Sequence, residues 1–213
     1  MSEPTAQPRM APARQKLLDA ALAVIREKGY VATTVDELCA RAGVAKGSFF
    51  HHFDGKEALA VAAANYWSET TGALFASAPY HTPKDPLDRI LGYIDFRRGL
   101  LKGDVPDFTC LVGTMVQETY DTHPAIRDAC DASISGHAAK LEADIDAAMK
   151  LYGVRDVFTA QSLALHTQAV LQGAFILAKA KGGAGIAIES VDHLHRYIEL
   201  LFNANKSKGR TTS

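Results

Sequence analysis

Residues 46–52 (KGSFFHH) combine side-chain types that bind nucleic acid. A lysine, a serine and two adjacent histidines can reach phosphate oxygens or base edges, and Gly47 permits a close approach to DNA. If Phe49 and Phe53 pack inward, the polar side chains of this stretch face outward together. On spacing alone, an ordinary helical hairpin with merely solvated polar residues remains the alternative.

Other groupings of polar residues are weaker candidates for chemistry. Neighbouring residues of a helix point about 100° apart and residues two apart do not share a face, which is poor spacing for a metal site. No Ser/His/Asp arrangement and no glycine-rich phosphate loop is visible, so we expect no enzyme, no cofactor and no metal. Two sets have ligand-type side chains close together in the sequence. The first is His51, His52 and Asp54, and the second is Glu142, Asp144 and Asp146.

The three cysteines form no CxxC pair, which argues against a disulfide framework and a structural zinc site. Cys110 follows a Pro-Asp turn near a predicted helix N-terminus, a position that can favour thiolate chemistry. A reactive sensor thiol is one hypothesis for Cys110, and a buried inert cysteine is the other. We interpret Cys39 and Cys130 as structural.

The elements that would position these residues are helical almost throughout, and the prediction is an all-α protein. A short helix over 35–42 and another over 45–52, joined at Gly43, have the layout of a helix-turn-helix. Thr34 with Glu37 predicts a capping box, and Asp54 with Glu57 predicts a cap for the next helix. The other predicted helices span 12–28, 56–76, 87–101, 108–119, 124–151, 157–181 and 190–204.

Composition indicates an ordinary globular chain with a weak charge asymmetry. The 213 residues carry a formal net charge of -1 and are 47% hydrophobic and 22% charged. Residues 1–56 contain eight Lys/Arg and six Asp/Glu, which gives +2, and the remainder is -3. A slightly basic N-terminal part is compatible with a phosphate partner. No signal peptide and no membrane-spanning run is visible, so we expect a cytoplasmic protein with no membrane partner.

Residues 14–59 closely resemble the DNA-binding domain of the TetR/AcrR family of regulators. About 46 residues match in register, which is far more specific than a lone motif. The stretches that carry the resemblance are 17–21 (LLDAA), 28–30 (KGY), 33–35 (TTV), 38–44 (LCARAGV), 46–53 (KGSFFHHF) and 56–59 (KEAL).

The resemblance implies an N-terminal three-helix helix-turn-helix DNA-binding domain and a C-terminal helical domain for ligand binding and dimerisation. It implies a repressor that leaves a double-stranded DNA operator when a small effector binds. The expected divisions are a disordered N-terminus (1–11), the DNA-binding domain (12–56), the effector-binding and dimerisation domain (57–205) and a flexible tail (206–213).

The resemblance also implies contacts with DNA. The hydroxyl of Thr34 should reach phosphate, and the start of the 45–52 helix should reach base edges. Two departures weaken the pattern: Ala45 lacks a capping hydroxyl, and Phe50 lacks the phenol that family members often direct at phosphate. The implied DNA-binding residues are Thr33, Thr34, Lys46, Gly47, Ser48, Phe50, His51, His52 and Lys56.

Aromatic and apolar residues after position 56 are candidates for an effector cavity, although such residues at helical spacing usually form core. The absence of a basic cluster in the sequence predicts a small effector that is mostly apolar or electrophilic. The candidates are Tyr66, Trp67, Phe75, Tyr93, Phe96, Phe108, Cys110, Met115, Tyr120, His166 and Phe175.

The last two predicted helices are rich in apolar residues, and in the family the equivalent helices form a four-helix bundle with a second copy. A twofold dimer implies a near-palindromic operator. Packing only within the monomer is the alternative, and a helical adaptor that binds no DNA is the alternative function. The predicted interface residues are Leu163, Val170, Leu171, Leu177, Leu194, Ile198 and Leu201.

Overall fold

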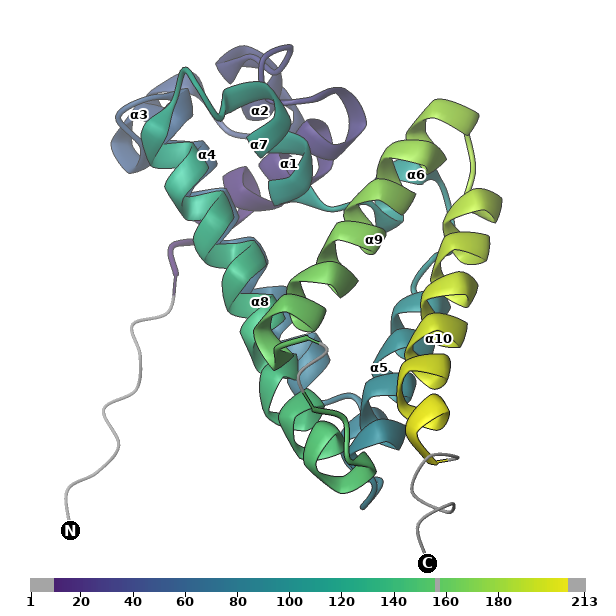
Figure 1. Ribbon diagram of the computed structural model, residues 1–213. Coiled ribbons are helices and arrows are strands. Elements are labelled where there is room, and N and C mark those ends of the chain that lie inside the picture. The colour runs from purple at the N-terminus through teal and green to yellow at the C-terminus, as the bar shows by residue number, and fades with distance from the viewer. Residues whose placement is uncertain (1–9, 156–157, 207–213) are drawn as a thin grey trace, which may run out of the picture.

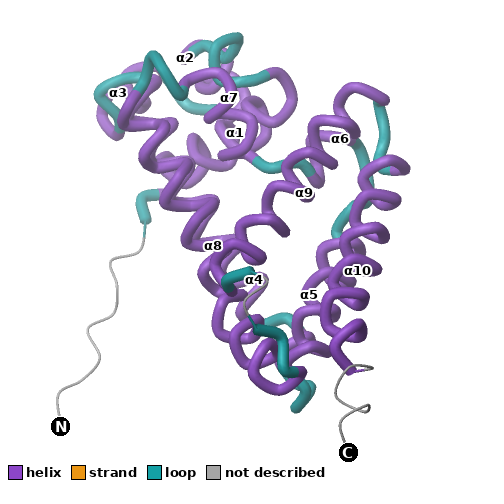
Figure 2. Tube along the Cα trace, in the orientation of Figure 1, coloured by secondary structure: helices purple, strands orange, loops and turns teal. Residues whose placement is uncertain are grey.

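A computed structural model describes residues 10–155 and 158–206, and every regular element within these ranges is helical (Figure 2). The all-α prediction is therefore confirmed. The predicted disordered N-terminus falls largely, and the predicted tail almost wholly, outside the described residues. None of the described helices is both long enough and apolar enough to cross a membrane.

The N-terminal unit is built from α1 (Pro12–Lys28), α2 (Val35–Ala42) and α3 (Lys46–His52). The chain turns between α2 and α3 at Gly43, whose φ of 63° lies in the left-handed region that favours glycine. Leu17, Leu38 and Phe49, one from each helix, are fully buried and share one core. The predicted helix-turn-helix is therefore present at the predicted residues.

The C-terminal part follows from α4 onward, and Figure 1 shows α5, α9 and α10 forming a lobe beside the long α8. The proline-rich segment between α4 and α5 contains one 3₁₀ turn, Pro79–His81. The helices are α4 (Lys56–Ala76), α5 (Pro86–Gly99), α6 (Val105–Phe108), α7 (Leu111–Thr119), α8 (Pro124–Tyr152), α9 (Ala160–Lys181) and α10 (Gly185–Lys206).

Helix α7 packs with the N-terminal unit although it lies far along the chain, as Figure 1 shows. Leu111, Val112 and Met115 are at most 1% exposed and belong to the same core as α1. A second core lies among α5, α8, α9 and α10. Helix α7 therefore packs into the core of the N-terminal unit and also against α8.

The predicted helices differ from the structure most at three places, and one predicted cap is absent. The helix predicted over 108–119 is two helices, because Thr109 and Cys110 are extended and the Cys110 sulfur caps α7 by accepting the Gly113 N–H at 3.4 Å. Helix α9 begins three residues later than predicted, and α10 begins at Gly185, well before the predicted 190. The predicted Asp54 cap is wrong, since Gly55 occupies the N-cap of α4 and no side chain caps it.

Candidate DNA-binding surface and effector cavity

Helix α3 presents one buried residue and an otherwise accessible surface. Phe49 is fully buried, whereas Lys46, Gly47 and His51 are exposed, and Ser48 and His52 are half-buried. The Lys46 ammonium lies 2.7 Å from an Asp36 carboxylate oxygen, and both side chains are largely exposed. A phosphate can therefore compete for Lys46 without disturbing the core.

The two threonines before α2 have different surroundings. Thr34 is exposed and caps α2, its hydroxyl accepting the Glu37 N–H at 3.3 Å. The Glu37 carboxylate also forms an ion pair with Lys28. Thr33 is 1% exposed and its hydroxyl donates to the Gly29 carbonyl at 2.6 Å. Thr33 closes the loop internally, which corrects its prediction as a DNA contact.

Helix α3 shows both predicted departures from the family pattern. Ala45 is its N-cap residue and no side chain satisfies the first-turn amides. Phe50 is 53% exposed and its ring packs edge-on against Phe49. An exposed phenylalanine on this helix suits apolar contact with a thymine methyl group better than a phosphate hydrogen bond.

Lys56 is held within the N-terminal unit. Its ammonium donates to the carbonyls of Tyr30, Val31 and Thr33 at 3.0–3.4 Å, and it lies 4.3 Å from the centroid of the Tyr30 ring. Burial lowers the pKa of Lys56. Lys56 therefore connects α4 to the loop after α1. A phosphate would have to compete with these three carbonyl oxygens for the Lys56 ammonium.

Replacing Lys56 by methionine should lower the free energy of unfolding by about 1–2 kcal/mol, because three carbonyls lose a charged donor. Chemical denaturation monitored by circular dichroism measures this loss. Lys84→Met, at a position between η1 and α5, is the matched control and should change stability little. Equal free energies of unfolding for the Lys56 variant and wild type would show that the hydrogen bonds of Lys56 do not stabilise the fold.

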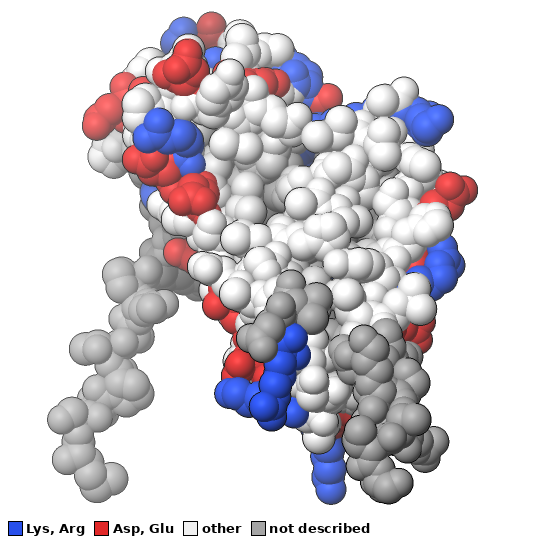
Figure 3. Space-filling model, viewed as in Figure 1, with Lys and Arg blue, Asp and Glu red and all other residues white. Residues whose placement is uncertain are grey.

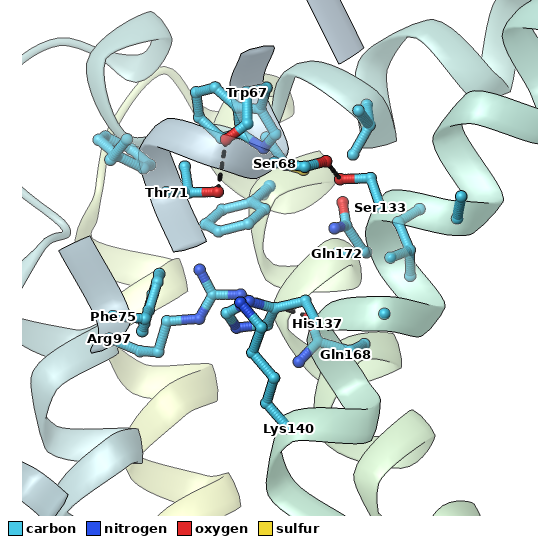
Figure 4. A pocket seen from close by; sticks show the side chains of 17 residues that line it. Trp67, Ser68, Thr71, Phe75, Arg97, Ser133, His137, Lys140, Gln168 and Gln172 are labelled. Atoms are coloured by element: carbon cyan, nitrogen blue, oxygen red, sulfur yellow. Dashed lines mark hydrogen bonds between the residues drawn. The ribbon is translucent and has the colours of Figure 1, made fainter. Parts of the chain in front are cut away.

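A cavity of about 240 Å³ lies among α4, α5, α8 and α9 and the α6–α7 junction (Figure 4). Its apolar wall combines aromatic and aliphatic side chains, and its polar groups come mainly from α4, α5, α8 and α9. The lining residues are Trp67, Ser68, Thr71, Phe75, Arg97, Phe108, Cys110, Val112, Ala132, Ser133, Ile134, Gly136, His137, Lys140, Gln168, Gln172 and Phe175.

Five of the predicted effector-site residues line this cavity: Trp67, Phe75, Phe108, Cys110 and Phe175. The other predicted residues do not line this cavity. Met115 is fully buried in the N-terminal core, and Tyr66 hydrogen-bonds to Gln15 and Asp19 on α1. Phe96 packs on Phe75 outside the cavity lining. Tyr120 is 63% exposed, and His166 is exposed beside Tyr197. Tyr93 lies behind the wall, 1% exposed.

The polar lining residues were missed because they are dispersed along the chain. Arg97 comes from α5, His137 and Lys140 from α8, and Gln168 from α9. The reason for expecting a mostly apolar effector was the absence of a basic cluster in the sequence. That reason no longer holds, because Arg97 and Lys140 line the same cavity in the folded protein. The i, i+3 spacing of His137 and Lys140 was the one available signal.

The other two cysteines are free and buried. Cys130 is fully buried and burial raises the pKa of its thiol to about 12, so the thiol stays protonated. Burial also raises the pKa of Cys39. Within the described ranges, no three His, Cys, Asp or Glu side chains come together as a metal site.

Several contacts connect the cavity wall to the N-terminal unit. The Arg26 guanidinium of α1 lies 5.3 Å from the ring centroid of Trp67, and it donates to the Asp107 carbonyl at 3.1 Å. Near the C-terminal end of α7, the Glu118 carboxylate accepts the Val31 N–H of the loop after α1 at 2.8 Å. Val112 both lines the cavity and belongs to the N-terminal core. A change in the cavity can therefore reach the helix-turn-helix through α7 and α1.

The predicted dimer residues divide into two groups. Leu163, Leu171, Leu194 and Ile198 are at most 3% exposed in the protomer's own core, so their side chains cannot contact a partner, which corrects those four. Val170 and Leu201 are half-buried. Leu177 is 43% exposed. The other large exposed apolar side chains of α9 and α10 are Leu165, Ile176, Tyr197 and Leu200.

Two family models match the chain. Residues 17–63 match the model described as bacterial regulatory proteins, tetR family, and residues 86–192 match the tetracyclin repressor-like C-terminal domain. The chain therefore belongs to the TetR family, whose members are DNA-binding transcriptional regulators and not enzymes. The resemblance found in the sequence is confirmed, and so is the arrangement of a helix-turn-helix with a C-terminal helical domain.

Curated relatives match over part of their length. The transcriptional regulator AcuR of Cereibacter sphaeroides is 33% identical over 122 residues, 53% of each protein. The repressor KstR2 of Rhodococcus jostii is 46% identical over 46 residues, 22% of each. The matches to the regulators YerO and YvkB of Bacillus subtilis span 19% and 51% of those proteins. The chain thus spans about a fifth to a half of these relatives.

Solved structures match nearly throughout. A TetR transcriptional regulator from Chloroflexus aurantiacus has a TM-score of 0.76 and 27% identity, with 88% of this chain and 94% of that chain covered. A TetR-family regulator from Agrobacterium tumefaciens has a TM-score of 0.75 at 19% identity, covering 88% of this chain and 98% of that one. The second likeness shows the shared fold alone.

Proposed function

We propose that this protein is a homodimeric repressor that binds a near-palindromic operator in the cytoplasm and leaves it when a small effector fills the cavity. The observation that carries the proposal is α3, which buries only Phe49 in the core and leaves its lysine and first histidine exposed. A helix presented in this way fits the major groove, and the exposed Thr34 at the start of α2 is available for a phosphate contact.

Dimerisation is supported by the outer faces of α9 and α10. Figure 3 shows few charged side chains over these helices. Ile176 and Leu200 are 48% and 67% exposed, and Leu165, Leu177 and Tyr197 add three more large exposed apolar side chains on the same two helices, as expected for a face that a partner covers. Two copies joined there would hold two α3 helices for two half-sites, about one DNA turn or a multiple of it apart.

Effector release is supported by the position of the cavity. It lies on α4, which starts in the N-terminal unit, and beside α7, which packs in that unit's core. An effector that prefers one arrangement of these helices shifts the population away from the DNA-binding one. The apolar wall fits a mostly apolar body, and Cys110 would meet any electrophile held there.

Replacing Lys46 by alanine tests the DNA-binding surface. Because the variant removes a positive charge that pairs with phosphate, it should bind all DNA sequences more weakly and reduce the slope of log K against log salt by about one. Fluorescence anisotropy with labelled operator at several salt concentrations measures both quantities. Lys150→Ala, at the C-terminal end of α8, removes the same charge far from α3 in Figure 1 and should leave the slope unchanged.

The partner of Lys46 gives the converse test. Asp36→Asn removes an anion that competes with phosphate for the Lys46 ammonium, so operator affinity should rise. An unchanged salt slope in Lys46→Ala would remove α3 from the DNA interface.

A further inference from the structure

We propose that the cavity binds a small carboxylate, whose anionic group pairs with Arg97 and Lys140 while its apolar body lies against the aromatic wall. The inference rests on the proposed function, because it names the chemical class of the effector. Three observations support it: neither cation has an anionic partner among the described residues, hydrogen bonds fix the direction of Arg97, and the cavity is small.

Both cations lack an anion. In the described part of the chain, neither Arg97 nor Lys140 forms an ion pair, and no Asp or Glu lines the cavity. The Arg97 guanidinium instead lies against the rings of Phe75 and Tyr93, with its carbon 4.9 Å and 5.7 Å from their centroids. A half-buried guanidinium on aromatic faces is positioned for a ligand carboxylate.

A hydrogen-bond network fixes the direction of Arg97. Its Nε donates to the Tyr93 hydroxyl at 3.1 Å and its Nη2 donates to the side-chain amide oxygen of Gln168 at 3.3 Å. The Gln168 amide then donates to the same Tyr93 oxygen at 3.1 Å. Because Nη1 makes no hydrogen bond within the described residues, a guanidinium edge remains for a bidentate contact.

His137 completes the network as a neutral group. Since the Tyr93 oxygen accepts from Arg97 and Gln168, its single proton points at His137 Nε2, 3.0 Å away. Burial, with the nearby charges of Arg97 and Lys140, lowers the pKa of His137 to about 3. The imidazole therefore adds no charge, and the field at this end of the cavity is set by two cations.

Figure 4 shows Arg97, His137 and Lys140 with their nitrogen atoms directed toward one part of the cavity. Lys140 is exposed and its ammonium reaches across to Gly72 on α4. Trp67, Phe108 and Phe175 also line the cavity and supply aromatic surface. The cavity thus combines two cations with aromatic surface.

The size and charge of the site favour a carboxylate over a phosphate ester. A volume of about 240 Å³ is below the range of drug-sized pockets, roughly 300–1,000 Å³. A monoanion is neutralised by Arg97 with help from the exposed Lys140.

Trp67 provides a local test, because it is the single tryptophan of the chain and it lines the cavity. Fluorescence titration of the full-length protein with butanoate, hexanoate and octanoate should show saturable changes. Hexanamide and hexanol, which match hexanoate in length without the charge, should bind at least tenfold more weakly. Butyl phosphate tests the competing anion class.

Arg97→Gln should weaken hexanoate binding roughly 10- to 100-fold, as expected for loss of a charged hydrogen-bond donor. Because Arg97 also supports Tyr93 and Gln168, Lys140→Gln is the second variant: it leaves the fold's hydrogen bonds intact and should weaken binding about two- to fivefold. Lys150→Gln, on the same helix and exposed, is the matched control and should bind as wild type.

The inference is overturned if hexanamide or hexanol binds as tightly as hexanoate, if butyl phosphate binds best, or if no carboxylate binds at millimolar concentration. It is also overturned if neither Arg97→Gln nor Lys140→Gln weakens binding. These results leave the proposed function standing as long as operator binding is intact. Carboxylate binding without any sequence-specific DNA binding would instead reject the proposed function and keep the carboxylate site.

Discussion

The double substitution Ile176→Asp and Leu200→Asp should give a folded monomer whose operator affinity is lowered roughly 100- to 10,000-fold. Both side chains are exposed on the outer faces of α9 and α10 in the protomer, so carboxylates there cost the protomer little. In a dimer the same carboxylates would be buried without partners, which is strongly unfavourable. Separated protomers bind half-sites one at a time, without the gain in affinity that tethering gives.

Sedimentation velocity at micromolar concentration and anisotropy with labelled operator measure the two effects. Leu74→Asp is the matched control, since Leu74 is 44% exposed on α4, a helix outside the proposed interface. Circular dichroism should show the same helix content in all three proteins. A double variant that still sediments as a dimer would place the interface on another surface.

Glu118→Ala should separate effector binding from release of DNA. The Glu118 carboxylate accepts the Val31 N–H, and a Cβ at Gly29 would collide with it, so the carboxylate fills a space shaped by the loop after α1. Gly29 has a φ of 90°, which keeps this loop in a conformation suited to glycine. The contact joins the C-terminal end of α7 to the loop that leads into α2.

With this contact removed, effector affinity measured by Trp67 fluorescence should stay within about twofold of wild type, whereas the weakening of operator binding by effector should fall about fivefold or more. Asp121→Ala removes the same charge two residues beyond the end of α7, where the described residues show it no partner, and should respond as wild type. Full release in Glu118→Ala would mean that coupling runs through α4 or Arg26 instead.

The sequence was sufficient for the helix-turn-helix because its signals are local. The glycine at position 43, the cap at Thr34 and the spacing of Leu38 and Phe49 each act within a few residues, and the structure has α2 and α3 at the predicted places. The predicted helix boundaries and caps were wrong where two neighbouring residues were both plausible at the same position. Asp54 has a side chain suited to a helix cap, but Gly55 occupies the N-cap of α4. Cys110 lies within the helix predicted over 108–119, but in the structure it is the N-cap residue of α7.

The cavity could not be predicted to the same degree, because its chemistry comes from tertiary packing. Arg97 gains its role only when α5 brings it beside Gln168 of α9 and His137 of α8. Periodicity also did not distinguish two kinds of apolar residue on α9 and α10. Leu171 and Ile198 pack inside the protomer, and the residues that remain outside depend on how the two helices are rotated.

Footprinting of the purified protein on DNA of its own genome tests the central claim most directly, that α3 reads an operator as one half of a dimer. We predict sequence-specific protection of a near-palindrome, with half-sites about one DNA turn or a multiple of it apart. Protection should weaken steeply as salt rises. Protection that is absent, or that is equal on all sequences at every salt concentration, would contradict the account.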